Sequence, residues 1–190
     1  MQESPNWGAF APSPAVLYPF MFLSALGFLL SLIAHIVSIC GITIPSQIHI
    51  MALHVGIFVV WLPAVLMANR MTNSTNRKDL WKVALIGCPL WMRWSFYIIG
   101  GYALLNFLFF ILRGGTRAPG GEASPSIVWG FSGHWLAFYG AAFAILYSAI
   151  HAPQIMQKRY CPEGHETSPS DDFCPKCGHP LTPISKPFTI

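Results

Sequence analysis

Residues 16–39 read VLYPFMFLSALGFLLSLIAHIVSI and contain no Asp, Glu, Lys or Arg. A helix needs about 20 predominantly apolar residues to cross the hydrocarbon core of a bilayer, so this stretch predicts a membrane span. Three further stretches also lack every charged residue, and they cover 49–68, 94–112 and 127–150. The four stretches together predict an all-α integral membrane protein built as a four-helix bundle.

The composition of the whole chain fits a bilayer environment. Of its 190 residues, 54% are hydrophobic and only 9% are charged, whereas a soluble domain usually carries about 25% charged residues. The residues before the first apolar stretch include an acidic side chain and no basic one, which is not the pattern of a cleaved signal peptide. We therefore expect the first stretch to remain in the protein as a span.

Lysine and arginine residues are distributed unequally between the two ends of the predicted spans. One side holds only Arg113 and Arg117, both in the loop after the third span. By the positive-inside rule the richer side faces the cytoplasm, and with four spans both termini lie there. The basic residues of the richer side are Arg70, Arg77, Lys78, Lys82, Arg93, Lys158 and Arg159.

The segment 79–92 is apolar enough to touch a membrane, but Gly87 and Pro89 interrupt it. Proline lacks a backbone N–H and breaks a helix when it lies in the interior. We therefore predict an interfacial segment before the third span, rather than one long helix through both.

Two short motifs near the end of the chain carry metal-ligating side chains. The first runs Cys161-Pro-Glu-Gly-His165 and the second Cys174-Pro-Lys-Cys177-Gly. Zinc prefers four tetrahedral Cys or His ligands, and a set of four without an open position is structural. Cys161, His165, Cys174 and Cys177 therefore predict a structural zinc site.

The segment 160–181 resembles the zinc-ribbon family, whose hallmark is the Cys-Pro-x-Cys-Gly knuckle found here at 174–178. The first knuckle departs from the family pattern because Gly164 stands where a second cysteine would fall and His165 follows it. His179 is therefore an alternative fourth ligand. Iron held as in rubredoxin fits less well, since that site uses four thiolates. A module this small cannot build a hydrophobic core, so we expect metal binding to supply most of its folding free energy.

These motifs divide the chain into three parts. We expect a cytoplasmic N-terminal segment at 1–15, a transmembrane bundle at 16–152, and a cytoplasmic zinc ribbon with a tail at 153–190. A surface that binds nucleic acid should be clearly basic, but the third part is balanced. A protein partner or a larger membrane complex is therefore favoured over nucleic acid. Its basic residues are Lys158, Arg159, Lys176 and Lys186, and its acidic residues are Glu163, Glu166, Asp171 and Asp172.

Polar and small residues recur at three- and four-residue spacing along the predicted spans, which is how membrane helices pack closely. Counting 1.5 Å per residue from the outer ends places one polar residue of each span roughly 6–10 Å below the outer boundary. We call this set the histidine layer. Its members are His35, His54, Asn106 and His134.

The histidine layer allows more than one function. Ionisable groups inside spans are functional candidates, and neutral imidazoles from facing helices ligate haem b iron or copper. The same side chains also serve as hydrogen-bonding partners that hold helices together, or as a proton or substrate path.

Three functions follow from these features. The first is an accessory, assembly or scaffold protein whose ribbon docks a protein partner. It needs no catalytic residue, and none is evident, because no span carries a carboxylate and no nucleophile–base pair stands out. The second is a small redox or metal protein that uses the histidine layer for haem or copper. The weaker third is an oligomeric transporter or channel, which lacks a charged ring to select an ion.

Overall fold

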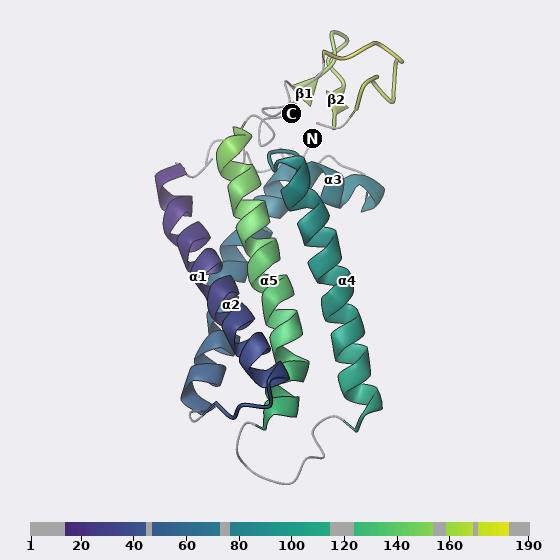
Figure 1. The fold of residues 1–190 in the computed structure, drawn as a ribbon. Helices are drawn as coiled ribbons and strands as arrows, with labels where there is room; N and C mark the ends of the chain where they lie inside the picture. The colour runs from purple at the N-terminus through teal and green to yellow at the C-terminus, as the bar shows by residue number, and fades with distance from the viewer. Residues whose placement is uncertain are drawn as a thin grey trace, which may run out of the picture.

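The computed structural model is predominantly helical, and four of its helices are long and apolar enough to cross a membrane (Figure 1). They are α1 (Pro14–Ile39), α2 (Gln47–Thr72), α4 (Leu90–Leu112) and α5 (Pro125–His151). The structure describes residues 14–44, 47–72, 77–114, 124–153, 159–168 and 171–182. Most of the predicted segment 1–15 lies outside these ranges, as do Arg117, Lys158 and Lys186.

The predicted spans are confirmed as helices, and each helix is longer than its uncharged stretch. Proline and serine residues set where α4 and α5 begin. Pro89 precedes the first residue of α4, and Pro125 occupies the first turn of α5, where a missing N–H costs nothing. Ser124 caps α5, since its side chain accepts a hydrogen bond from the backbone N–H of Ile127.

α5 lies at the centre of the bundle and packs against α1, α2 and α4 (Figure 1). Its most apolar stretch is 67% buried, against 28%, 22% and 17% for those of α1, α2 and α4. The other helices therefore depend on α5 for most of their contacts, and α4 packs mainly on α5 alone.

Glycines bring the helices into close contact. A Cβ added at Gly27 of α1 would lie 2.2 Å from the ring of Tyr139 in α5. The hydroxyl of that tyrosine donates a hydrogen bond of 2.7 Å to the carbonyl of Leu53 in α2. One α5 side chain thus contacts both neighbouring helices, an arrangement that only a small residue on α1 permits.

The predicted interruption of 79–92 is present. A single 3₁₀ turn (Arg77–Asp79) leads into α3 (Leu80–Ala84), which runs across the end of the bundle (Figure 1). The chain then turns and enters α4. Arg93 donates to the carbonyls of Cys88 at 2.9 Å and Ile86 at 2.6 Å, so it satisfies backbone groups that the broken helix leaves open.

The same turn is fastened to α5. The backbone N–H of Gly87 donates to the hydroxyl of Ser148 at 3.0 Å, and the Cys88 thiol lies 3.1 Å from the carbonyl of Ala144. Val83 and Cys88 of this segment are both buried. The segment is therefore part of the packed end of the bundle.

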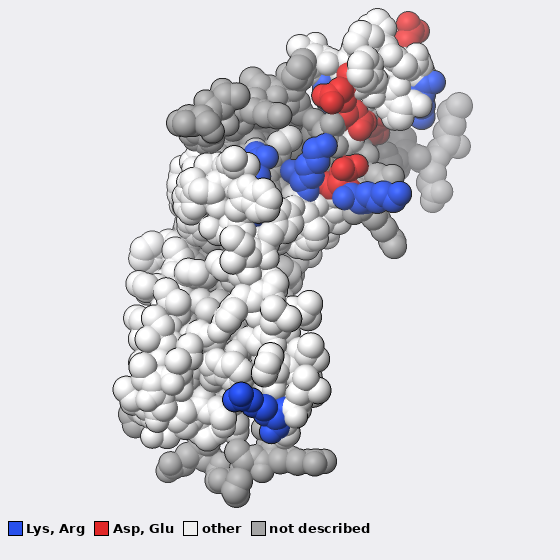
Figure 2. All heavy atoms as spheres, turned by 45° about the vertical axis from the view of Figure 1, so that its right-hand side comes forward, with Lys and Arg blue, Asp and Glu red and all other residues white. Residues whose placement is uncertain are grey.

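Charged side chains gather toward the two ends of the molecule and leave an uncharged band over the length of the helices (Figure 2). Large apolar side chains cover this band and are open to the surroundings, including Phe22 at 68% exposure and Leu104 at 71%. A surface this apolar is the surface of a protein in a bilayer. The chain is an integral membrane protein.

A small module follows α5 and lies beyond the end of the bundle (Figure 1). Strand β1 (Arg159–Tyr160) pairs antiparallel with β2 (Glu166–Thr167), and an isolated bridge joins Phe173 to Pro180. Among its described residues, the buried apolar cluster consists of Cys161, Cys174 and Leu181. This core is too small to fold a module by itself.

Candidate metal centre and the polar layer of the bundle

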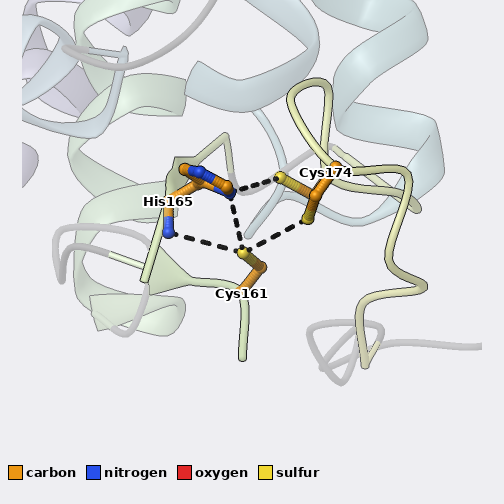
Figure 3. Close-up of side chains that lie close together, drawn as sticks. Cys161, His165 and Cys174 are labelled. Carbon is orange, nitrogen blue, oxygen red and sulfur yellow. Dashed lines mark hydrogen bonds between the residues drawn. The ribbon is translucent and has the colours of Figure 1, made fainter. Parts of the chain in front are cut away.

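Four Cys and His side chains of the C-terminal module converge on one point. The ligand atoms of Cys161, His165, Cys174 and Cys177 all lie within 4.8 Å of one another. Figure 3 shows the first three pointing toward each other from the two knuckles. The described residues contain no other group of three or more Cys, His, Asp or Glu that could hold a metal ion.

The two knuckles reach this point by different turns. Gly164 and Gly178 have φ of 78° and 71°, a left-handed conformation that glycine adopts without strain. In the second knuckle the left-handed glycine follows Cys177, whereas in the first it stands in the cysteine's place. The first knuckle therefore turns one residue earlier than the second. As a result, His165 lies in the cluster in place of a residue at position 164.

Three of the six distances between ligand atoms are close to those of a metal site, and all six are within 4.8 Å. The Cys161 sulfur lies 3.5 Å from Nδ1 of His165 and 3.7 Å from the sulfur of Cys177, and the Cys174 sulfur lies 3.9 Å from the same Nδ1. Ligands of a tetrahedral site with bonds of about 2.0–2.3 Å are separated by about 3.3–3.8 Å. The imidazole of His179, the alternative ligand, is not in the cluster. The backbone carbonyl of His179 instead accepts a hydrogen bond from the N–H of Cys174.

Backbone amides prepare the cluster for a cation. Burial raises the pKa of the Cys174 thiol. Hydrogen bonds from the backbone N–H groups of Cys177 and Lys176, and from the thiols of Cys177 and Cys161, have the larger effect and lower this pKa to about 6. The N–H of His165 also donates to the Cys161 sulfur at 3.4 Å. Thiolate is the form of cysteine that binds metal, so the surroundings of Cys174 favour the ligating form of this one thiol. At Cys177 a hydrogen bond from the backbone of His179 lowers the pKa, but burial and the neighbouring thiols outweigh it and raise the pKa.

The structure brings the members of the histidine layer together in two separate groups. The first group centres on His35 of α1. Its Nδ1 lies 2.7 Å from the hydroxyl of Ser132 in α5, and its Nε2 lies 2.5 Å from the hydroxyl of Tyr102 in α4. The Ser132 hydroxyl donates to the carbonyl of Trp129, so it accepts from Nδ1–H, while Tyr102 donates to Nε2. Both ring nitrogens of His35 are thus already hydrogen-bonded.

Asn106 extends this group along α4. In the orientation that satisfies its amide, the nitrogen donates to the carbonyls of Gly130 and Trp129 at 3.1 Å, and the oxygen accepts from the indole N–H of Trp129 at 3.3 Å. Gly133 provides the room, because a Cβ there would lie 2.4 Å from the side-chain amide group of Asn106. The side chain therefore ties α4 to α5.

The second group contains the other two histidines. Nδ1 of His54 accepts a hydrogen bond of 3.0 Å from the indole N–H of Trp135. The rings of His54 and His134 meet edge to face with centroids 5.7 Å apart, and Phe131 lies 5.3 Å from His134 in the same manner. The geometry gives no support to haem or copper at either group.

Sequence reasoning missed Ser132 as the partner of His35. The signal available in the sequence was that Ser132 lies two residues before His134, at nearly the same predicted depth as His35. Ser132 has no exposed surface, so its hydroxyl serves as a helix-joining hydrogen-bond partner and is closed to a substrate.

Comparisons with protein family models, curated proteins and solved structures give no match for this chain.

We expect His35→Ala to destabilise the bundle by about 1–3 kcal/mol, because it removes two hydrogen bonds between helices and leaves two hydroxyls without their partner. Ser24→Ala is the matched control, since that buried hydroxyl bonds only to the Phe20 carbonyl of its own helix. Denaturant unfolding in micelles measures both. Equal stability of the two variants would contradict a joining role for His35.

Proposed function

We propose that this protein is a membrane accessory or assembly protein whose cytoplasmic zinc module docks a protein partner. The observation that carries the proposal is the closed set of four ligands, Cys161, His165, Cys174 and Cys177, in a module outside the bundle. Four protein ligands leave no open position for a substrate, which is the property of a structural site.

The donor set favours zinc. Three sulfurs and one imidazole nitrogen form a Cys₃His set, and zinc accepts it in tetrahedral geometry. Iron in such modules needs four thiolates, and hard cations prefer oxygen. The zinc-ribbon resemblance of 160–181 agrees with this choice.

The charge distribution supports the placement of the module in the cytoplasm. Arg70, Lys82 and Arg93 lie toward the end of the bundle that carries the module, and Arg113 follows the opposite end of α4. Cytoplasmic ends of membrane helices are enriched in lysine and arginine. Both termini are then cytoplasmic.

The surface of the module suits a protein partner better than nucleic acid. Tyr160 and Phe173 are 53% and 64% exposed, and aromatic side chains are enriched at protein interfaces. The charges do not form a basic patch. Within 159–182 the basic residues are Arg159 and Lys176, and the acidic residues are Glu163, Glu166, Asp171 and Asp172.

Affinity purification from membranes under mild detergent tests the proposal. We expect the tagged protein to elute with a defined partner in a complex larger than the chain alone, and Phe173→Ser to lose the partner while keeping its zinc. Cys40→Ser is the control, because this exposed cysteine lies outside the module. A monodisperse protein that carries zinc and no partner, with identical elution of the wild type and both variants, would refute docking.

A further inference from the structure

The three thiols of the candidate metal centre differ in their access to solution. Cys161 and Cys174 are buried, at 4% and 2% exposure, whereas Cys177 is exposed. A small reagent dissolved in water therefore reaches Cys177 first. The sulfur of Cys177 lies on the second knuckle and is 3.7 Å from the sulfur of Cys161 on the first. An accessible thiol thus lies beside a buried one across the junction of the two knuckles.

The third thiol belongs to the same turn as Cys177. The backbone N–H of Gly178 donates to the carbonyl of Cys174 at 2.8 Å, and the N–H of Cys174 donates to the carbonyl of His179 at 2.9 Å. A bond between the sulfurs of Cys174 and Cys177 would have to form inside this tight turn. A bond between Cys177 and Cys161 joins two different knuckles and leaves the turn intact, so we take these two cysteines as the pair that reacts.

Joining the two sulfurs requires a two-electron oxidant, and hydrogen peroxide is one that reaches an exposed thiol. The Cys177 thiolate attacks one peroxide oxygen, which breaks the O–O bond and yields a sulfenic acid and a hydroxide ion. The Cys161 thiolate then attacks the sulfenic sulfur, so the S–S bond forms, the S–O bond breaks and a second hydroxide ion leaves. Each sulfur loses one electron, the peroxide gains two, and two protons from the solvent convert the hydroxide ions to water.

This disulfide leaves too few ligands to hold a metal ion. A structural zinc site uses four protein ligands, and only His165 and Cys174 of the four candidates remain. Among the described residues of the module, the buried apolar cluster consists of two of the cysteines and Leu181. The folding of so small a module depends on its metal, so oxidation removes both the zinc and the fold that the zinc maintains.

We propose that the C-terminal module is a redox-sensitive switch, in which a peroxide joins Cys177 to Cys161 and the module loses its zinc. The proposal rests on the zinc site of the proposed function and is independent of the identity of any partner. Disulfides in the cytoplasm are usually transient and serve catalysis or redox sensing. A reductant that returns the two cysteines to thiols therefore allows the module to bind zinc and fold again.

Zinc release from the full-length protein in detergent micelles tests the proposal. Protein that carries zinc is treated with hydrogen peroxide, and a chromogenic indicator measures the zinc in solution. We expect at least tenfold more free zinc than in the untreated sample. Reduction with a phosphine, followed by addition of zinc, should restore the original zinc content of the protein.

Peptide mass spectrometry identifies the bond that forms. Trypsin cleaves after Arg159 and Lys176, so Cys177 begins one peptide while Cys161 and Cys174 share the preceding one. After alkylation of the free thiols, we expect these two peptides to be linked, with fragmentation placing the bond at Cys161 and the alkyl group on Cys174. Cys40→Ser is the matched control, because it removes an exposed cysteine outside the module, and it should release zinc to the same extent as the wild type.

Zinc that stays bound throughout the peroxide treatment would overturn the switch and leave the zinc site of the proposed function standing. Protein that binds no zinc before treatment would instead contradict the zinc site, and the switch with it. Release of zinc with a bond between Cys174 and Cys177, with sulfinic acid at Cys177, or only when Cys40 is present would also overturn the proposal, because the reaction would then differ from the one that the structure favours.

Discussion

Cys174→Ser is expected to lower the bound zinc from one ion per chain to near zero and to unfold the C-terminal module. In small zinc modules the metal contributes about 10–16 kcal/mol of apparent binding free energy at neutral pH, which is folding free energy. Among the described residues of the module, the buried apolar cluster consists of Cys161, Cys174 and Leu181, so two of its three members are candidate ligands themselves. Inductively coupled plasma mass spectrometry of the purified protein measures the metal.

Three controls make the result specific. Cys40→Ser should keep one zinc per chain, because Cys40 lies at the end of α1 and outside the cluster. His165→Ala should lose zinc, whereas His179→Ala should retain it. Helical circular dichroism should stay close to wild type in all of them, since the bundle does not depend on the module. Zinc retained by Cys174→Ser and His165→Ala together would show that these residues are not the ligands.

Gly87→Ala is expected to cost about 2–4 kcal/mol of bundle stability. An added Cβ would lie 2.6 Å from the carbonyl oxygen and 2.9 Å from Cα of Ser148. These are backbone atoms of the central helix, so no flexible side chain can move aside. The turn must lift away from α5, which also breaks the hydrogen bond from the Gly87 N–H to the Ser148 hydroxyl.

Gly100→Ala provides the matched comparison. Nothing lies within 4 Å of a Cβ added at Gly100, so the change should be neutral or stabilising by up to about 1 kcal/mol through helix propensity. Reversible unfolding of both variants in mixed micelles measures the difference. If Gly87→Ala unfolds at the same denaturant concentration as Gly100→Ala, the result contradicts the close packing of the turn on α5.

The features that sequence analysis predicted are those encoded over short distances in the chain. An uncharged stretch such as 16–39 identifies a span because each backbone and side-chain group must tolerate hydrocarbon by itself. The break at Gly87 and Pro89 is likewise local. The four Cys and His side chains that could hold a metal ion lie within 161–177, so spacing alone places them in one small module.

The features that it could not predict depend on how the helices rotate against each other. Depth along the membrane placed His35, His54 and His134 in one layer, but depth does not say which side of each helix faces which neighbour. The fit of Gly27 against Tyr139 and of Gly133 against Asn106 helps to set those rotations. They direct His35 toward Ser132 and bring His54 to His134, so one predicted layer became two groups.

The central position of α5 has a consequence for biosynthesis. A ribosome delivers a chain from its N-terminus, so α1, α2 and α4 enter the membrane before the helix on which they all pack. Until Pro125–His151 is inserted, His35 and Asn106 have no Ser132 or Trp129 to bond and face lipid or one another. Assembly of the bundle is therefore the last event of insertion, and a chain stopped before residue 125 is three loosely held helices with polar side chains exposed to hydrocarbon.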